Sequence, residues 1–241
     1  MNDKPVINLA SIPAELKSLP RWILWRKETR NGETTKVPVS PQGLPVSVTD
    51  PKHWLSFEQA ARAFDPQRYS GLGYVLTKED GICCIDLDDA IDESGNICPE
   101  AMQIVEQMNS WTEISQSGKG LHIFLRGTKP TTKAKVTPKT FKALEIYDHA
   151  RYIAITGNHL QGTSLNVEER QAELNALCEK YFSAKEPEIT PPQSPEKPHH
   201  NGLSDDEILS RCRRAKNGDK FARLFDYGDV SAYGNDESRA D

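Results

Sequence analysis

The stretch Gly81-Ile-Cys-Cys-Ile-Asp-Leu-Asp-Asp89 has the pattern of a β-strand whose apolar residues give way to acidic ones. Successive side chains of a strand point to opposite faces, so Asp86 and Asp88 share one face while Ile85 and Leu87 point into the core. Two carboxylates on one strand face repel each other unless a divalent cation bridges them. The pattern therefore predicts a metal-binding strand.

A second interpretation of these two acids stays open. Asp89 and Asp92 follow closely, so Asp86 and Asp88 could simply end a strand that runs into an acidic turn. That interpretation does not explain why the acids alternate with core residues. Asp89 is expected to face away from the pair and to cap the turn that follows.

A glycine-containing loop, Ser117-Gly-Lys-Gly-Leu-His122, leads into a later apolar stretch. Its glycines, Gly120 among them, let backbone amides approach an anion closely, and Lys119 adds positive charge. With Ser117 the loop is a candidate phosphate site, and an ordinary tight turn is the alternative. It lacks the Gly-x-x-x-x-Gly-Lys-Ser/Thr pattern of a Walker A loop. A neutral His122 can donate a hydrogen bond to a phosphate oxygen, and a protonated one does so more strongly.

The stretch Leu144-Glu-Ile-Tyr-Asp148 supplies a further acid. Glu145 shares a strand face with Tyr147, whereas Asp148 lies at the strand end, and both acids are candidates for a third site carboxylate. Arg151 follows closely; it suits a triphosphate, and its alternative is an ion pair with Asp148. Two acids, then a histidine, then an acid, on successive short strands, predict a two-metal phosphoryl-transfer site.

Periodicity predicts both strands and helices along the first 183 residues. Strands are predicted at 21–26, 34–39, 73–77, 82–88, 111–115, 121–126, 142–147 and 152–156. Helices are predicted at 56–64, with Ser56 and Gln59 as a capping box, at 99–109, and after Asn166, which has Glu169 three residues on as a capping partner. The first two strands form a hairpin around Asn31-Gly32. The strands at 73–77 and 82–88 are joined by a short turn and are expected to pair antiparallel.

Composition divides the chain into three parts. Residues 1–183 are long enough for one good-sized domain. Residues 184–202 are rich in proline and predict a linker. Residues 203–241 are too few for a core of their own; Ser204 and Glu207 predict a capped helix to about residue 217, which could begin a further module or dock on a partner.

The overall charge and the cysteines exclude several classes of protein. A net charge of −5 argues against a generic polyanion binder. The basic residues between 126 and 151 could form a solvated loop or touch phosphates beside the acidic site.

No stretch approaches a membrane span and no apolar signal core is present, so we expect a cytoplasmic protein without a membrane partner. The five cysteines lack Cys-x-x-Cys spacing, so neither disulfides nor zinc are expected.

The order of these motifs, followed by Arg151-Tyr-Ile-Ala-Ile-Thr-Gly157, resembles that of the bifunctional DNA primase–polymerases of phages and plasmids, in the archaeo-eukaryotic primase superfamily. Arg21-Trp-Ile-Leu-Trp-Arg26, Lys36-Val-Pro38 and Thr49-Asp-Pro51 also resemble the phage members. The resemblance covers roughly residues 15–182. It implies an α/β (α+β) fold: a mainly antiparallel, RNA-recognition-motif-like core plus an N-terminal α/β unit, with residues 1–183 as the primase-polymerase catalytic domain.

The resemblance also implies roles for the site residues. Asp86, Asp88 and Glu145 would hold two Mg²⁺ or Mn²⁺ ions, with Asp148 as the alternative third ligand. The family's third acid is often Asp, and Glu also ligates these ions through oxygen. The family's second motif, a small residue two positions before a histidine, falls on Gly120 and His122, and its histidine contacts the phosphates of the incoming nucleotide. The full set expected to hold the triphosphate is Ser117, Lys119, Gly120, His122 and Arg151.

The implied activity is template-directed nucleotidyl transfer by a DNA primase/polymerase in phage or plasmid replication, in the cytoplasm of a bacterial host. Its partners would be template DNA, a primer and nucleoside triphosphates, with a helicase module or protein in longer relatives. Two other classes stay open. A metal-dependent nuclease also needs clustered carboxylates, and a non-catalytic module could bind nucleotide or DNA without turnover.

Overall fold

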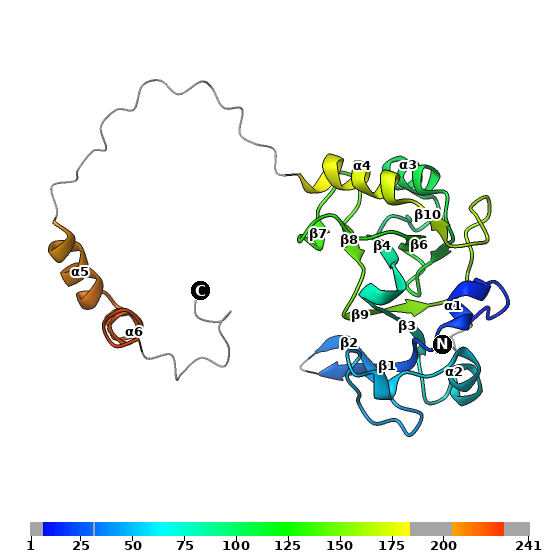
Figure 1. Cartoon of the computed structure of the whole chain (residues 1–241), viewed down its shortest axis with the longest axis horizontal. Coiled ribbons are helices and arrows are strands. Elements are labelled where there is room, and N and C mark those ends of the chain that lie inside the picture. Colours follow the sequence, from blue (N-terminus) through cyan, green and yellow to red (C-terminus); the bar gives the residue numbers. More distant parts are fainter. Residues whose placement is uncertain (1–6, 31, 184–203, 229–241) are drawn as a thin grey trace. The chain divides into compact units, whose positions relative to one another are not determined.

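The computed structural model describes residues 7–30, 32–183 and 204–228. The chain divides into two compact units, residues 1–184 and residues 185–241 (Figure 1). The predicted linker at 184–202 lies outside the described residues.

The first unit contains a four-stranded antiparallel sheet in the order β2-β1-β3-β9. Its strands are β1 (Trp22–Arg30), β2 (Glu33–Val39), β3 (Gly71–Leu76) and β9 (Arg151–Ile155). β1 and β2 form the predicted hairpin. Beside this sheet lie α1 (Ala14–Ser18), η1 (Pro51–His53) and α2 (Phe57–Ala63), and α2 begins with the predicted capping box of Ser56 and Gln59.

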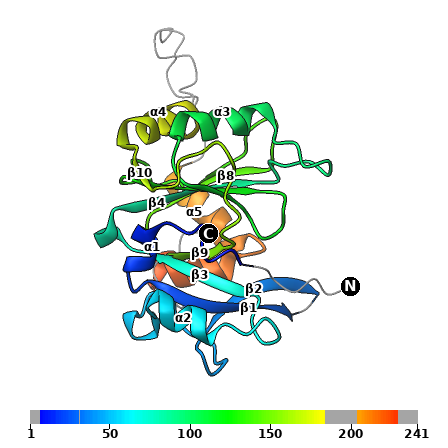
Figure 2. The same ribbon diagram turned by 90° about the vertical axis from the view of Figure 1, so that its right-hand side faces the viewer.

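The second sheet of the first unit has six strands. β10, β6, β4, β8 and β7 follow one another in that order, and β5 also pairs with β6. The strands are β4 (Ile82–Asp88), β5 (Thr112–Ile114), β6 (Leu121–Arg126), β7 (Lys135–Val136), β8 (Ala143–Tyr147) and β10 (Glu168–Glu169). All pairs are antiparallel except β10 with β6. α3 (Pro99–Met108) and α4 (Gln171–Phe182) cover one side of this sheet, and the four-stranded sheet lies on the other (Figure 2). The predicted α/β class with mainly antiparallel strands is confirmed.

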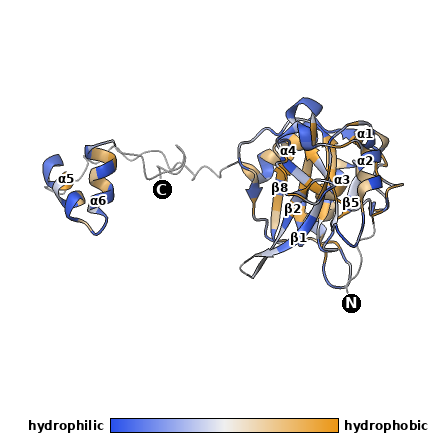
Figure 3. Cartoon of the chain, turned by 90° about the horizontal axis from the view of Figure 1, so that it is seen from below, coloured by the Kyte–Doolittle hydropathy of each residue, from blue (hydrophilic) through white to orange (hydrophobic). Residues whose placement is uncertain are grey.

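The two faces of β4 belong to different hydrophobic cores. Cys83, Ile85 and Leu87 pack with α3 and α4. Ile82 and Cys84 face the other way and join the core that includes the four-stranded sheet. Figure 3 shows hydrophobic residues concentrated on the strands of this unit. Asp86 and Asp88 continue the face of Ile82 and Cys84, so the carboxylates begin where this apolar packing ends.

The predicted pairing of residues 73–77 with 82–88 is wrong. β3 lies between β1 and β9, whereas β4 lies between β6 and β8. Both edges of each strand are therefore occupied by other partners. The connection is the turn η2 (Lys78–Asp80), in which Asp80 accepts hydrogen bonds from Arg21 at 2.6 and 2.9 Å and from the Thr77 hydroxyl at 2.7 Å. This anchored turn carries the chain from one sheet to the other instead of closing a hairpin.

The helix predicted to start after Asn166 begins later. α4 starts at Gln171, and Glu169 belongs to β10, which pairs in parallel with β6. Arg170 precedes the helix and donates to the carbonyls of Met108 and Asn109 at 2.6 and 3.2 Å. Strand pairing and this arginine outweigh the local capping pattern.

The described part of the second unit is helical. It contains α5 (Asp205–Arg214), α6 (Gly218–Phe221) and the π-helical turn η3 (Ala222–Asp226). The predicted capping box of Ser204 and Glu207 is present, but α5 ends three residues before the predicted residue 217. Within the described residues, no helix combines the length and the apolar character needed to cross a bilayer.

Candidate active site

Strand pairing brings the three sequence motifs together. Asp86 on β4 lies directly opposite His122 on β6 and directly opposite Glu145 on β8. Directly opposed residues on antiparallel strands have their Cβ atoms about 4.5–5.5 Å apart. Asp88, two residues along β4, is on the same face. The acidic motif, the histidine motif and the third acid thus meet on one face of the six-stranded sheet.

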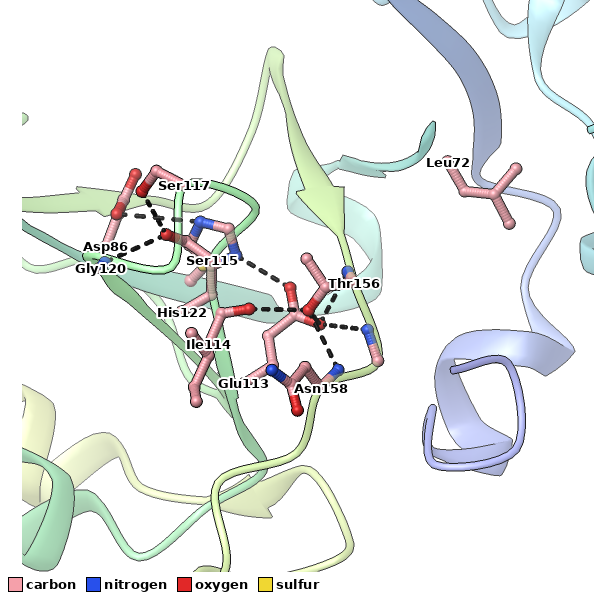
Figure 4. A network of polar contacts seen from close by, with 12 residues as sticks. Leu72, Asp86, Glu113, Ile114, Ser115, Ser117, Gly120, His122, Thr156 and Asn158 are labelled. Atoms are coloured by element: carbon pink, nitrogen blue, oxygen red, sulfur yellow. Dashed lines mark hydrogen bonds and ion pairs between the residues drawn. The ribbon is translucent and has the colours of Figure 1, made fainter. Parts of the chain in front are cut away.

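His122 lies between two carboxylates. Its Nδ1 is 2.9 Å from Oε1 of Glu113, and its Nε2 is 3.9 Å from Oδ1 of Asp86 (Figure 4). The side chain is 5% exposed. Burial by itself lowers the pKa of His122, but the hydrogen bond to Glu113 and the charges of Asp86 and Glu113 outweigh it, so the pKa lies above its ordinary value. The surroundings therefore favour the protonated ring.

Glu113 is a site residue that the sequence reasoning missed. It is on β5, directly opposite His122, and is completely buried. Its Oε2 accepts hydrogen bonds from the amides of Thr156 at 3.0 Å and Gly157 at 2.8 Å, and the Thr156 hydroxyl, which donates to the Ile114 carbonyl at 2.7 Å, lies 3.1 Å away. The signal was a glutamate inside a short strand between Trp111 and Ile114, where a charged side chain needs buried partners.

Glu145 has two partners of its own. The Lys135 ammonium is 2.6 Å from Oε1, and the Tyr147 hydroxyl donates a hydrogen bond to Oε2. Burial raises the pKa of Glu145, but these two hydrogen bonds outweigh it and the net pKa is below the usual value. Glu145 is therefore a carboxylate held in its charged form.

Asp148, the alternative third acid, lies elsewhere. Cys84 opposes Tyr147 in the register, so Asp148 is level with Cys83 near the start of β4, three residues from Asp86. Its carboxylate is 2.5 Å from Nδ1 of His149 and accepts from the amide of Lys129 at 3.3 Å. It lines a separate cavity of about 470 Å³. The geometry places Glu145 and not Asp148 next to Asp86.

The carboxylates of Asp86, Asp88 and Glu145 are suitable ligands for a hard divalent cation, but their oxygens do not point to one common position. In the described parts of the chain, no three His, Cys, Asp or Glu side chains form a ready metal-binding group. Burial and then the charges of Asp88 and Glu145 raise the pKa of Asp86, against the opposing charges of His122 and Lys36. A cation would relieve this repulsion, and oxygen ligands suit Mg²⁺ or Mn²⁺. Glu145 would have to turn away from Lys135 to join such a site.

The loop before His122 is a tight turn. The amides of Gly118 and Gly120 donate to the Ser115 carbonyl and hydroxyl at 2.9 and 3.2 Å, and the amide of Lys119 donates to the Ser117 hydroxyl at 3.2 Å. These amides are used within the turn, so the predicted backbone cradle for an anion is not formed by them. The side chains of Ser117 and Lys119 are exposed, although the Ser117 hydroxyl also lies 3.1 Å from the Ser115 hydroxyl.

Gly120 has a steric role in this turn. A Cβ added there would lie 2.8 Å from the Leu87 carbonyl oxygen and 3.7 Å from Cα of Asp88. The loop therefore rests directly on the acidic end of β4, and only glycine permits that approach.

Two positively charged side chains, Arg151 and Lys36, come from the four-stranded sheet. The Arg151 guanidinium lies 4.6 Å from the ring centroid of Tyr147, and Asp148 pairs with His149 rather than with Arg151. Lys36 on β2 is the second and was not among the predicted site residues. Partial burial lowers the pKa of Lys36, while the charges of Asp86 and Asp88 oppose that shift. The interaction places Lys36 within electrostatic reach of the two acids.

Three of the seven lysines and arginines between 126 and 151 form ion pairs in the described structure. Arg126 forms an ion pair with Glu15, Lys135 with Glu145 at 2.6 Å, and Lys142 with Asp89 at 3.4 Å. Of these three basic residues, only Lys135 contacts one of the site carboxylates, Glu145. The stretch is thus not a uniform phosphate-binding surface.

No protein-family model matches the chain. A DNA primase-polymerase from Nitratiruptor phage NrS-1 is 39% identical to it over 160 residues. The match covers 64% of this chain and 22% of the phage protein, so the chain spans about a fifth of that relative's length. The match confirms the resemblance carried by the motifs: this chain is a relative of a phage DNA primase-polymerase.

Proposed function

We propose that the chain carries out template-directed nucleotidyl transfer, as a DNA primase/polymerase in phage replication. The observation that carries this proposal is the register that sets Asp86 between His122 and Glu145. The name of the phage relative supports a primase or polymerase activity. Template DNA, a primer and nucleoside triphosphates would be the substrates, and a helicase partner stays a prediction.

In this reaction the primer 3′ oxygen attacks the α-phosphorus of a nucleoside triphosphate. One P–O bond forms, the bond between the α-phosphorus and the bridging oxygen to the β-phosphate breaks, and pyrophosphate leaves. Asp86, Asp88 and Glu145 would hold two Mg²⁺ or Mn²⁺ ions. Such ions, when bound, lower the pKa of the 3′ hydroxyl and offset charge on the triphosphate.

The remaining residues would bind the triphosphate. His122 is favoured in its protonated form, with Nδ1 donating to Glu113, so Nε2 is the nitrogen available to a phosphate oxygen. Arg151 and Lys36 would add positive charge from the four-stranded sheet. Lys119 and Ser117 would contribute exposed donors from the turn. The triphosphate would then lie among cations, with the carboxylates beside its α-phosphate.

A primer-extension assay on the full chain tests the proposal. The chain is incubated with a primed DNA template, Mg²⁺ or Mn²⁺, and either the four deoxynucleotides or the four ribonucleotides. We expect template-dependent extension that a chelator abolishes, and an unprimed template tests priming. Degradation of the DNA without added nucleotide would instead identify a nuclease, and nucleotide or DNA binding without turnover would identify a non-catalytic module.

A further inference from the structure

Glu113 lies directly behind the proposed phosphate-binding histidine and reaches no solvent. It is on β5 and faces His122 on β6. Its contacts extend to Thr156 and Gly157, which follow the last residue of β9. The carboxylate therefore joins His122 to the end of a strand of the other sheet (Figure 4).

The two carboxylate oxygens of Glu113 have different hydrogen-bonding partners. Oε2 accepts from two backbone amides, those of Thr156 at 3.0 Å and Gly157 at 2.8 Å. The Thr156 hydroxyl lies 3.1 Å away but has a single hydrogen, which its 2.7 Å contact directs to the Ile114 carbonyl. The two amide bonds fix the plane and position of the carboxylate. Oε1 is left for Nδ1 of His122 at 2.9 Å. An ionised carboxylate only accepts hydrogen bonds, so Nδ1 must carry the hydrogen.

We propose that Glu113 is a positioning residue: it holds the His122 ring with Nδ1 as donor and so directs Nε2 toward Asp86 and the substrate. The proposal rests on the proposed function, because it takes the substrate to be a nucleoside triphosphate. Glu113 itself touches neither the substrate nor the acidic pair. Loss of a carboxylate that orients a metal-ligating histidine typically changes metal affinity or activity by about 10–100-fold, and we expect an effect of that order for this phosphate-binding histidine.

Glu113→Gln makes a sharp test because it changes one hydrogen-bonding group at nearly constant shape. The two backbone amides at Oε2 require an acceptor, so the amide oxygen of glutamine must take that place. The amide NH₂ then faces Nδ1 of His122, and two donors cannot pair. Nδ1 must give up its hydrogen and accept, which places the hydrogen of a neutral ring on Nε2.

The first part of the experiment measures the protonation of the two His122 ring nitrogens by NMR and does not depend on enzymatic turnover. The full chain is labelled with ¹⁵N-histidine, and the ring signals of His122 are identified among those of the six histidines by their loss in His122→Ala. We expect Nδ1 to be protonated in the wild type and unprotonated in Glu113→Gln. Identical ring signals in the two proteins would overturn the proposal.

The second arm asks whether Glu113 acts through His122. Glu113→Gln should raise KM for the nucleotide by about tenfold, with a smaller change in kcat, because a binding contact is misdirected. In a His122→Ala background the same substitution should have no further effect on either constant. An equal loss in both backgrounds would show that Glu113 acts elsewhere and would overturn the proposal.

Ser110→Ala is the matched control for a structural role. Ser110 is fully buried beside the same strands, and its hydroxyl bonds the Phe124 carbonyl and the Glu168 amide without reaching His122. We expect Ser110→Ala to lower thermal stability but to leave the His122 ring signals and KM unchanged. A Ser110→Ala protein with the same ring and KM changes would reduce Glu113 to a packing residue. If the ring signals respond as expected but wild-type chain extends no primer, the proposed function fails while the positioning role stands.

Discussion

Asp86 and Glu145 face each other directly across the neighbouring strands β4 and β8. The pairing makes Glu145 the carboxylate nearest the acidic motif in the sheet register, while Asp148 is level with Cys83 near the other end of β4 and pairs with His149. A shift of the register by one residue would have turned Glu145 to the opposite face. The identity of the third acid is therefore a property of strand pairing.

Glu145 and Asp148 can be separated by removing each charge. Glu145→Gln keeps the shape of the side chain but removes the charge, so we expect primer extension to fall by at least about a hundredfold, the scale of losing metal-ion catalysis worth several kcal/mol. Asp148→Asn should keep extension within about tenfold of wild type, an effect under about 1.4 kcal/mol. The reverse order would assign the third carboxylate to Asp148. Thermal unfolding of both variants shows whether either loss reflects unfolding.

Asp86 should be needed for activity and costly for stability. Burial and the charges of Asp88 and Glu145 disfavour its ionised form in the folded chain, which raises its pKa. Asp86→Asn should therefore raise the melting temperature in metal-free buffer at neutral pH, while extension falls by at least about a hundredfold. Asp89→Asn is the control: Asp89 is next to the pair, its side chain is 51% exposed, and it contacts Lys142. Extension near the wild-type level in Asp86→Asn would exclude the proposed metal role.

Gly120→Ala tests the contact between the turn and β4. The new Cβ would lie 2.8 Å from the Leu87 carbonyl, so the turn must move away from Asp88. We expect a loss of about 1–3 kcal/mol in the free energy of unfolding, with a loss of extension. Gly118→Asn is the comparison, because Gly118 has φ of 73° but nothing within 4 Å of its Cβ position. Asparagine tolerates that backbone, so unfolding and extension should change little. Equal effects at both positions would remove the steric argument.

Lys36 should contribute to nucleotide binding from the four-stranded sheet. Lys36→Gln removes a charge within reach of Asp86 and Asp88. Because a charge-assisted hydrogen bond contributes roughly 1.5–3 kcal/mol, we expect KM for the nucleotide to rise about ten- to a hundredfold. The exposed Lys52 serves as the control, and Lys52→Gln should leave KM unchanged. Steady-state extension over a range of nucleotide concentrations gives both values. An unchanged KM in Lys36→Gln would remove Lys36 from the site.

The division of the chain predicts that a protein ending at Ser183 folds and extends a primer. Every residue of the proposed site precedes that position, and residues 1–184 form a compact unit. Circular dichroism and extension of a pre-annealed primer check this, with the full chain alongside. We expect extension within about tenfold of the full chain, an effect below about 1.4 kcal/mol. Loss of extension in a folded truncated protein would place part of the catalytic unit after residue 184.

Much of the local structure follows from the sequence because it depends on nearby residues. Alternation along β4 places Ile85 and Leu87 in the core and Asp86 and Asp88 on the other face, as the structure confirms. The capping boxes at Ser56 and Ser204 also form as predicted. The capping pattern at Asn166 failed because β10 pairs with β6 and Arg170 bonds to the end of α3. A local signal is reliable only where no distant partner competes with it.

The sequence by itself determined the chemistry that is available: two acids on one strand face, a histidine after a glycine turn, a third acid on another strand, and the resemblance that these motifs carry. The tertiary structure decided which of these residues meet. Separating β3 and β4 into different sheets freed both edges of β4, so that β6 and β8 could bring His122 and Glu145 to Asp86. It also placed Glu113 behind His122 and Lys36 near the acids. Strand neighbours are chosen by long-range packing and hydrogen bonding, which no local pattern records, and so these contacts appear only in the folded chain.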